Sequence, residues 1–509
     1  MKEKIVKNTL YSGISSIIMG IIGFFLLPFM IAKVGVVEYG LVGISNIFAM
    51  SGYISILEMG FQSSMAVYIA DYYSQKEELK ICQLVNSVMI IFIVSGSVLM
   101  ILGIILSDFF VTYLLKIPDI YRSSFNTMLC LIFSSYVIQF PTIALAGLFQ
   151  GLQRFDILKG VQTLTVIIAA LSIILLLNHG FDYTVIIISN LASFIIQFIL
   201  FLLFSFKKVP FLKISHKYFS LKIIKEIFIM TKYLSIGNLS SLISIHTPRI
   251  LIGLFLGPIL MTSFEVVMRL PRFIKVQLGF LNSAVMTAAS ELKATNQNEK
   301  IRELFLRGLR YQFIIAFPVI IGAMFFAREF LRNWVGQEFE NLSGLLQFVL
   351  IWNLITPIVN YGASILVGMN KELKRLMMLH VTTTAMGLIL SLALIWHYEL
   401  HGVIIGYAGS FILMFPWYLY IYLNEFRLKY PKFIKEIVSV IIISIIPAGI
   451  MFLTNRLMPT EGLLMLAVKG SILCLLYLCI LYALILNSQD RLTIARLIPI
   501  RNLRANSKG

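Results

Sequence analysis

The chain has 509 residues, of which 59% are hydrophobic and only 13% are charged. A soluble globular domain carries about 25% charged residues, so this composition excludes an ordinary soluble protein. Apolar runs of about 20 residues follow one another along the chain, and each is long enough for a helix to cross about 30 Å of hydrocarbon. The sequence therefore predicts an all-α, polytopic membrane protein.

The apolar runs predict about fourteen transmembrane helices. Their centres lie near residues 21, 51, 95, 136, 168, 195, 244, 277, 320, 356, 387, 413, 446 and 474. Twelve of them form two predicted six-helix lobes, at residues 1–206 and 233–424, and residues 425–486 supply two additional helices. A basic linker at residues 207–232 is expected to lie on the cytoplasmic membrane surface, and residues 487–509 form a basic cytoplasmic tail.

Lysine and arginine predict the orientation of these spans. If the N-terminus is cytoplasmic, 31 of the 42 basic residues fall in cytoplasmic segments and five fall within spans. The other six fall in outer loops: Lys33, Lys116, Arg122, Arg328, Arg332 and Arg456. This asymmetry predicts a plasma (bacterial inner) membrane protein with both termini in the cytoplasm. The net charge of +18 then favours contact with anionic membrane lipids, and no nucleic acid is expected as a partner.

The four cysteines have neither the spacing of a metal site nor that of a disulfide framework. They are Cys82, Cys130, Cys474 and Cys479, and at least three lie in apolar runs. Reduced, buried thiols are therefore expected, with no metal and no cofactor.

Two pairs of similar segments indicate an internal repeat. PFMIAKVGVVEYGLVG and RILIGLFLGPILMTSFEVV both pass from an apolar run through glycine to an aromatic–acidic pair, with Gly35 matching Gly257 at a separation of 222 residues. ALAGLFQGLQRFD and ASILVGMNKELKR both end in a polar, basic turn, with Gly151 matching Gly368 at a separation of 217 residues. Matching elements six spans apart have the same membrane orientation. The repeat therefore predicts two lobes related by a pseudo-twofold axis along the membrane normal.

Polar side chains share one face of several spans, which indicates a wet cavity or a protein contact within the membrane. In the span centred near residue 277, Glu265, Arg269, Arg272 and Ser283 share a face, and Lys275 lies at its edge. The predicted polar lining further includes Ser12, Ser16, Ser51, Ser55, Glu58, Gln62, Asn238 and His246. These residues come from the first two spans of each predicted half, as a cavity between the halves requires.

The basic members of this lining are the candidate substrate-binding residues. They are Arg249, Arg269, Arg272 and Lys275. Cationic groups in a low-dielectric cavity favour an anionic substrate, and arginine offers paired donors that match phosphate oxygens. The alternative for each is that the side chain snorkels to lipid headgroups. Glu58 can likewise be a buried acid bonded to a hydroxyl, and His246 a packed polar residue.

Four segments resemble the polysaccharide and oligosaccharide (O-antigen type) flippases of the multidrug/oligosaccharidyl-lipid/polysaccharide exporter superfamily. They are GVVEYGLVGI, ILEMGFQSSM, GLFQGLQRFD and LRNWVGQEF, which end or follow the first, second, fourth and ninth predicted spans. The resemblance implies two six-helix lobes in a V-shaped arrangement with two helices appended. It also implies movement of a polyprenyl-pyrophosphate-linked oligosaccharide from the cytoplasmic to the outer leaflet, for surface polysaccharide biosynthesis.

In such flippases basic cavity residues hold the pyrophosphate, and the four basic residues named above are the candidates here. Polysaccharide polymerase and glycosyltransferase machinery are implied partners. Two positions depart from the family pattern. An acidic residue is expected shortly before the arginine of span seven, where this chain has His246-Thr247-Pro248-Arg249, and span two ends in Glu58 where aspartate is more usual. The first departure weakens any acid-based coupling in that helix.

Two other functions compete with a flippase that works by alternating access. A multidrug or organic-cation exporter of the same fold would want acidic groups in the cavity, whereas the interior charges here are mostly basic. A membrane glycosyltransferase or polymerase usually needs acidic catalytic residues in large outer loops, and no predicted outer loop exceeds about 20 residues. A transporter, not an enzyme, is therefore expected.

Overall fold

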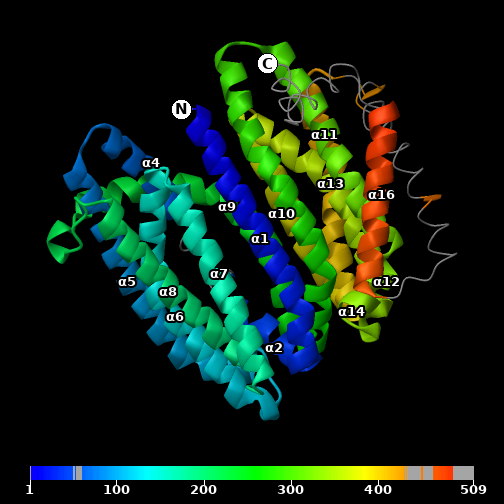
Figure 1. The fold of residues 1–509 in the computed structure, drawn as a ribbon, viewed down its shortest axis with the longest axis horizontal. Coiled ribbons are helices and arrows are strands. Elements are labelled where there is room, and N and C mark those ends of the chain that lie inside the picture. Colours follow the sequence, from blue (N-terminus) through cyan, green and yellow to red (C-terminus); the bar gives the residue numbers. More distant parts are fainter. Residues whose placement is uncertain are drawn as a thin grey trace, which may run out of the picture. The chain divides into compact units, whose positions relative to one another are not determined.

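The computed structural model describes residues 2–49, 52, 60–428, 430–431, 433, 449–450 and 462–484, which are helical apart from turns and short loops (Figure 1). No strand occurs in these residues, so the predicted all-α class is confirmed. The helices are α1 (Lys2–Val34), α2 (Val36–Ser45), α4 (Phe61–Ser74), α5 (Glu78–Phe109), α6 (Asp119–Gly151), α7 (Phe155–Asn178), α8 (Val185–Lys208), α9 (Leu221–Phe255), α10 (Pro258–Ala294), α11 (Asn298–Phe325), α12 (Ala327–Trp334), α13 (Ser343–Gly368), α14 (Leu373–Glu425) and α16 (Leu463–Leu484).

The helices coincide with most of the predicted spans. Twelve of the fourteen predicted centres lie within a helix, and the other two, near residues 51 and 446, lie outside the described residues. Eight helices in the described part of the chain are long and apolar enough to cross a membrane. The protein is therefore a multi-pass membrane protein, and the total of fourteen spans stays a prediction.

Helix α14 contains the two spans that the sequence places at residues 387 and 413. Its backbone leaves the helical region at Glu399, where φ is 45° and ψ is −124°. The Ser391 hydroxyl donates to the carbonyl oxygen of Val403 at 3.0 Å, across this break. The two arms of α14 are therefore folded against each other as a helical hairpin.

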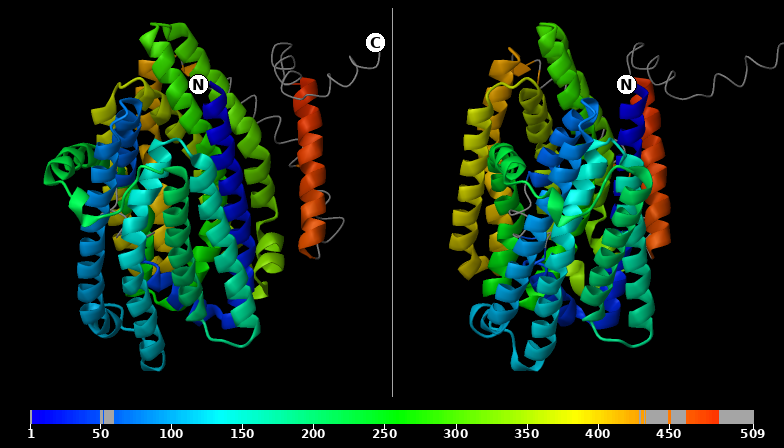
Figure 2. Two further views of the ribbon diagram at one scale, coloured as in Figure 1. Left: turned by 60° about the vertical axis from the view of Figure 1, so that its left-hand side comes forward. Right: turned by 90° about the vertical axis from the view of Figure 1, so that its left-hand side faces the viewer.

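The chain divides into two compact units, Met1–Gln277 with Lys374–Met414, and Leu278–Leu373 with Phe415–Gly509. In the first unit α1 packs against α7, and α6 packs against α4, α5 and α8 (Figures 1 and 2). In the second unit α13 and α16 both pack against α11. The predicted lobes at 1–206 and 233–424 have other boundaries and stay a prediction. The predicted linker at 207–232 contains the beginning of α9, at Leu221.

The two glycines matched by the predicted repeat occupy equivalent turns. Gly35 alone separates α1 from α2 and has a φ of 97°, and Gly257 separates α9 from α10 and has a φ of 81°. Residues with a β-carbon rarely adopt these angles, so glycine is what allows each helix to reverse within so few residues. The shared turn explains why these two segments look alike in sequence.

The second matched pair also has a common backbone geometry. Helix α6 ends at Gly151 and α13 ends at Gly368, and two residues later Gln153 and Asn370 both have positive φ, 55° and 51°. The amide of Arg154 donates to the carbonyl of Phe149, and the amide of Lys371 donates to the carbonyl of Leu366 in the same pattern. Both helices thus end in a left-handed cap that satisfies their last carbonyl groups.

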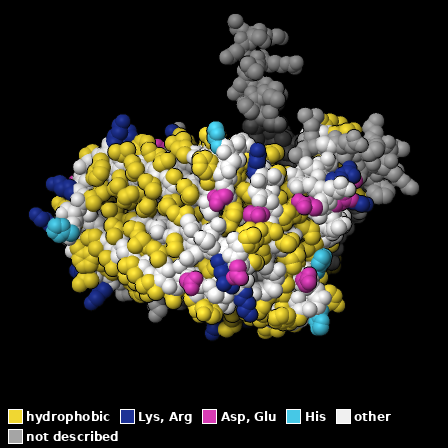
Figure 3. All heavy atoms as spheres, turned by 90° about the horizontal axis from the view of Figure 1, so that it is seen from below, with side chains coloured by type: hydrophobic (Ala, Val, Ile, Leu, Met, Phe, Trp, Pro, Cys, Tyr) yellow, Lys and Arg dark blue, Asp and Glu magenta, His cyan; other side chains and the backbone are white. Residues whose placement is uncertain are grey.

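Large apolar side chains are exposed on the outside of the helices. Ile105, Tyr113 and Trp396 are 69%, 68% and 70% exposed, and hydrophobic side chains cover much of the surface in Figure 3. In water such a surface would drive aggregation, whereas in a bilayer it faces hydrocarbon. The exposed apolar surface therefore agrees with the membrane assignment.

Candidate functional site

The candidate site is built on the hairpin formed by α9 and α10 in the first unit. Arg249 lies eight residues before Gly257, and Glu265 lies eight residues after it. With a rise of about 1.5 Å per residue, both side chains start about 12 Å from the turn. Two side chains at equal depth on antiparallel helices can meet, and these two do.

A buried carboxylate joins two arginines at this level. Nε of Arg249 donates to Oε1 of Glu265 at 2.7 Å, and its Nη2 lies 3.4 Å from Oε2. Nη1 of Arg272 donates to Oε2 of Glu265 at 2.9 Å. The side chain of Glu265 is 8% exposed, against 19% for Arg249 and 26% for Arg272. Oε1 therefore accepts from Arg249, and Oε2 accepts from both Arg249 and Arg272.

Arg272 reaches Glu265 because both project from the same face of α10, seven residues apart. Its guanidinium also lies 5.2 Å from the ring centre of Phe264, a cation–π contact. Tyr39 of α2 and His246 of α9, both buried, lie within electrostatic range of this group. We call Arg249, Glu265 and Arg272 the α9–α10 cluster.

The other two predicted basic residues extend the positive charge along α10. Arg269 donates to the backbone carbonyl of Gly23 on α1. Lys275 is half-buried and lies within electrostatic range of Arg272 and of His380, from the first arm of α14. Four cationic side chains and one carboxylate leave three net positive charges in this part of the first unit.

Some of the predicted polar lining residues are engaged between helices. Gln62 of α4 donates through Nε2 to Oε1 of Gln150 on α6 at 2.8 Å. Ser12 and Ser16 are half-buried on α1, where Ser15 between them bonds to Thr163 of α7 at 2.7 Å. The side chains of Gln62 and Ser15 therefore also hold neighbouring helices together.

The remaining predicted lining residues give less information. Asn238 lies in α9 and Ser283 in α10, but their side chains fall outside the described set. Ser51, Ser55 and Glu58 lie outside the described residues altogether. Cys82 and Cys130 are free thiols, and no group of three or more histidine, cysteine, aspartate or glutamate residues that could hold a metal occurs among the residues described.

Sequence reasoning gave Glu265 no role, although it placed this residue on the polar face. The acid expected shortly before Arg249 is absent from the sequence. The carboxylate that pairs with Arg249 comes from the next helix, sixteen residues later. A signal was available, because Arg249 and Glu265 are equally distant from a glycine that reverses the chain. Helix periodicity shows which residues share a face of one helix, but it does not show which residues of two helices meet across a turn.

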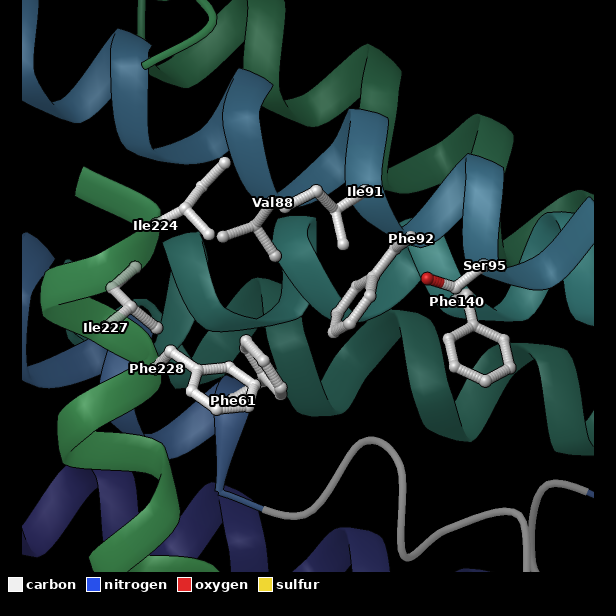
Figure 4. Close-up of a pocket in the computed structure, with 9 residues that line it drawn as sticks. All are labelled: Phe61, Val88, Ile91, Phe92, Ser95, Phe140, Ile224, Ile227 and Phe228. Carbon is white, nitrogen blue, oxygen red and sulfur yellow. The ribbon is translucent and has the colours of Figure 1, made fainter. Parts of the chain in front are cut away.

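A separate apolar cavity of about 350 Å³ lies among α4, α5, α6 and α9 of the first unit (Figure 4). Ile224, Ile227 and Phe228 project from α9 toward Val88, Ile91 and Phe92 of α5, and Phe61, Ser95 and Phe140 complete the lining. Only Ser95 offers a side-chain hydroxyl. This cavity suits hydrocarbon, whereas the α9–α10 cluster suits a charged group.

Half-buried arginines directed at one point have the donors that a multiply charged oxyanion requires. Guanidinium donors form short, charge-assisted hydrogen bonds to carboxylate and phosphate oxygens with the same geometry. The carboxylate of Glu265 occupies this position in the structure.

Comparison with known proteins gives consistent results. A "Putative O-antigen transporter" of Shigella flexneri is 22% identical over 413 residues, which are 80% of this chain and 95% of that protein. The structure of the Lipid II flippase MurJ in an inward closed conformation superposes with a TM-score of 0.72 and 15% identity, over 93% of this chain and 99% of that one. An inward-facing MATE multidrug transporter of the MOP superfamily gives 0.62 and 16%, over 82% and 95%.

The structural matches are too distant in sequence to indicate more than a common fold. The family match is more specific, because residues 5–292 match the family described as "Polysaccharide biosynthesis protein". That range is more than half of the chain and contains α1, α2 and the α9–α10 cluster. It also agrees with the resemblance carried by the sequence motifs. The chain belongs to the polysaccharide biosynthesis protein family.

Proposed function

We propose that this protein is a flippase that moves a polyprenyl-pyrophosphate-linked oligosaccharide from the cytoplasmic to the outer leaflet, as a transporter and not an enzyme. The observation that carries the proposal is the α9–α10 cluster, in which two half-buried arginines converge on one carboxylate. Family membership and the fold shared with a Lipid II flippase support it. The similarity to a putative O-antigen transporter of S. flexneri supports the same substrate class.

In the proposed cycle the diphosphate binds the arginines while the saccharide occupies a wet cavity and the prenyl chain stays in lipid. Binding neutralises positive charge that would otherwise be costly to enclose, so the loaded carrier can close on one side and open on the other. The empty carrier retains net positive charge. The membrane potential can then drive its return, since one charge moving through 100 mV is worth about 2.3 kcal/mol.

The proposal places the protein in the bacterial inner membrane with both termini in the cytoplasm. The excess of lysine and arginine in the predicted cytoplasmic segments supports this orientation. In that orientation the turns after α6 and α13 lie in the cytoplasm, and the Gly35 and Gly257 turns lie on the outer side.

The test is transport by the full chain in vesicles that contain a fluorescent polyprenyl-diphosphate saccharide, read out as loss of quenching by a membrane-impermeant reagent. Arg249→Gln and Arg272→Gln should each reduce the rate at least tenfold, because a hydrogen bond to a charged group contributes about 1.5–3 kcal/mol. Arg307→Gln is the matched control, since Arg307 is 53% exposed on α11 and forms an ion pair with its neighbour Glu303 on the same helix. Wild-type rates in both cluster variants would contradict the proposal.

An organic-cation exporter of the same fold is the alternative, because a MATE transporter shares the fold. Its substrate would be repelled by the net positive charge of the α9–α10 cluster with Arg269 and Lys275. Drug susceptibility of cells with the gene deleted and overexpressed separates the two functions. A flippase predicts no change in susceptibility to cationic drugs and a defect in surface polysaccharide.

A further inference from the structure

We propose that Glu265 is a displaceable counter-ion that occupies Arg249 and Arg272 in the empty carrier and raises the affinity that a lipid headgroup needs in order to bind there. The proposal rests on the function proposed above and goes further by assigning a role to an acid inside the binding site. It also explains how a carrier surrounded by phospholipid avoids transporting it.

The first argument is geometric. The two oxygens of Glu265 accept from two arginines on two different helices, at 2.7 and 2.9 Å. An oxyanion bridging two guanidinium groups is the arrangement that a phosphate group would adopt there. The carboxylate and the headgroup therefore compete for the same donors.

The second argument is energetic. Without Glu265, two guanidinium groups that are 19% and 26% exposed would face each other across a region of low dielectric constant. The acid compensates this repulsion when no substrate is bound. Since it is 8% exposed, it has little access to water, and it leaves the arginines only when another anion replaces it.

The third argument concerns selectivity. A phosphodiester headgroup of an ordinary phospholipid carries one negative charge, as Glu265 does, and gains little by replacing it. A diphosphate headgroup carries about two charges and more acceptor oxygens, so it outcompetes the carboxylate. An internal competitor lowers the apparent affinity for every headgroup by the same factor. The weaker ligand, the phospholipid, therefore falls below the affinity at which it occupies the site, whereas the diphosphate still binds.

The experiment measures binding of two probes to the purified full-length protein, farnesyl diphosphate and a short-chain phosphatidylglycerol. The wild-type protein should prefer the diphosphate by at least tenfold. Glu265→Gln keeps the size of the side chain but removes its charge, so the affinity for both probes should rise. Both affinities should rise by a similar factor of about ten, which corresponds to about 1.4 kcal/mol, and phosphatidylglycerol should then occupy the site.

Glu265→Asp is the charge-retaining comparison and should keep affinities close to those of the wild-type protein. If Glu265→Gln fails to fold, the proposal still requires those affinities of Glu265→Asp. Affinities that rise equally in both variants, or a Glu265→Gln variant that binds both probes more weakly, would show that Glu265 is only structural. Unchanged affinities in a folded Glu265→Gln protein would overturn the proposal as well.

The same data separate this inference from the proposed function. If the wild-type protein binds farnesyl diphosphate and Arg272→Gln abolishes that binding, the proposed function is supported whatever Glu265 does. If neither the wild-type protein nor Glu265→Gln binds the diphosphate, both the function and the counter-ion role are overturned.

Discussion

Two hairpins of the first unit, α1–α2 and α9–α10, share a turn but differ in chemistry. Both reverse at a glycine with positive φ, Gly35 or Gly257. With the separation of 222 residues between those glycines, Arg249 corresponds to Leu27, which is fully buried, and Glu265 corresponds to Gly43. The fold therefore does not require ions at these positions. The first hairpin carries its own charges at Lys33 and Glu38, but the ion pair at this depth occurs in the second hairpin.

The largest expected effect comes from moving the charge into the first hairpin. Leu27→Arg would bury a cation, and the residue that corresponds to Glu265 in the first hairpin is Gly43, which cannot pair with it. An unpaired buried charge costs more than about 4 kcal/mol of stability. We expect no monodisperse protein after detergent extraction. Leu27→Met, which conserves volume, should cost less than about 1.5 kcal/mol and serves as the control. A normal yield of Leu27→Arg would show that the first hairpin also tolerates a charge at this position.

A smaller effect is expected when the second hairpin is made to resemble the first. Arg249→Leu removes one partner of Glu265 but leaves Arg272, so thermal unfolding in detergent should show a loss of about 2 kcal/mol. Adding Glu265→Gln should recover part of that loss, because the unbalanced acid is gone. A double-mutant cycle measures this coupling, and a coupling energy near zero would contradict the ion-pair geometry. Neither variant should transport.

The smallest effect concerns what the hairpins have in common. Gly35→Ala and Gly257→Ala should each lower stability by about 1–2 kcal/mol, because alanine is strained at positive φ. The loss at Gly35 should be the larger one, because a β-carbon there would lie 2.7 Å from Oε2 of Glu38, whereas at Gly257 it would meet no atom within 4 Å. Gly160→Ala is a suitable control, because Gly160 lies within α7 and a β-carbon there meets no atom within 4 Å. A loss at only one of the two turns would argue against the repeat.

The sequence predicted the fold better than the site. Long apolar runs are a local signal, so the helices around residues 95, 136 and 168 could be predicted without knowing how they pack. The break at Glu399 also separates two spans that were predicted as distinct. The basic residues of α10 could be found because they repeat with helical periodicity.

The partners of these residues could not be predicted in the same way. Arg249 and Glu265 lie on different helices, and their contact depends on how the Gly257 turn aligns α9 with α10. The apolar cavity had no sequence signature at all, because its shape arises where four helices meet. The charge pattern predicts an anionic substrate, whereas only the tertiary structure shows that Glu265 bonds to both arginines.

The bond from Arg269 to the carbonyl of Gly23 makes position 23 an unusual target for mutation. The acceptor is main chain, so no exchange of side chains elsewhere on α1 can delete it. A β-carbon at position 23, however, would collide with the guanidinium itself. In a saturation mutagenesis screen the pattern along α1 should therefore be uneven, with broad tolerance on its exposed apolar face and lower tolerance at this glycine, where any side chain forces the Arg269 guanidinium to move.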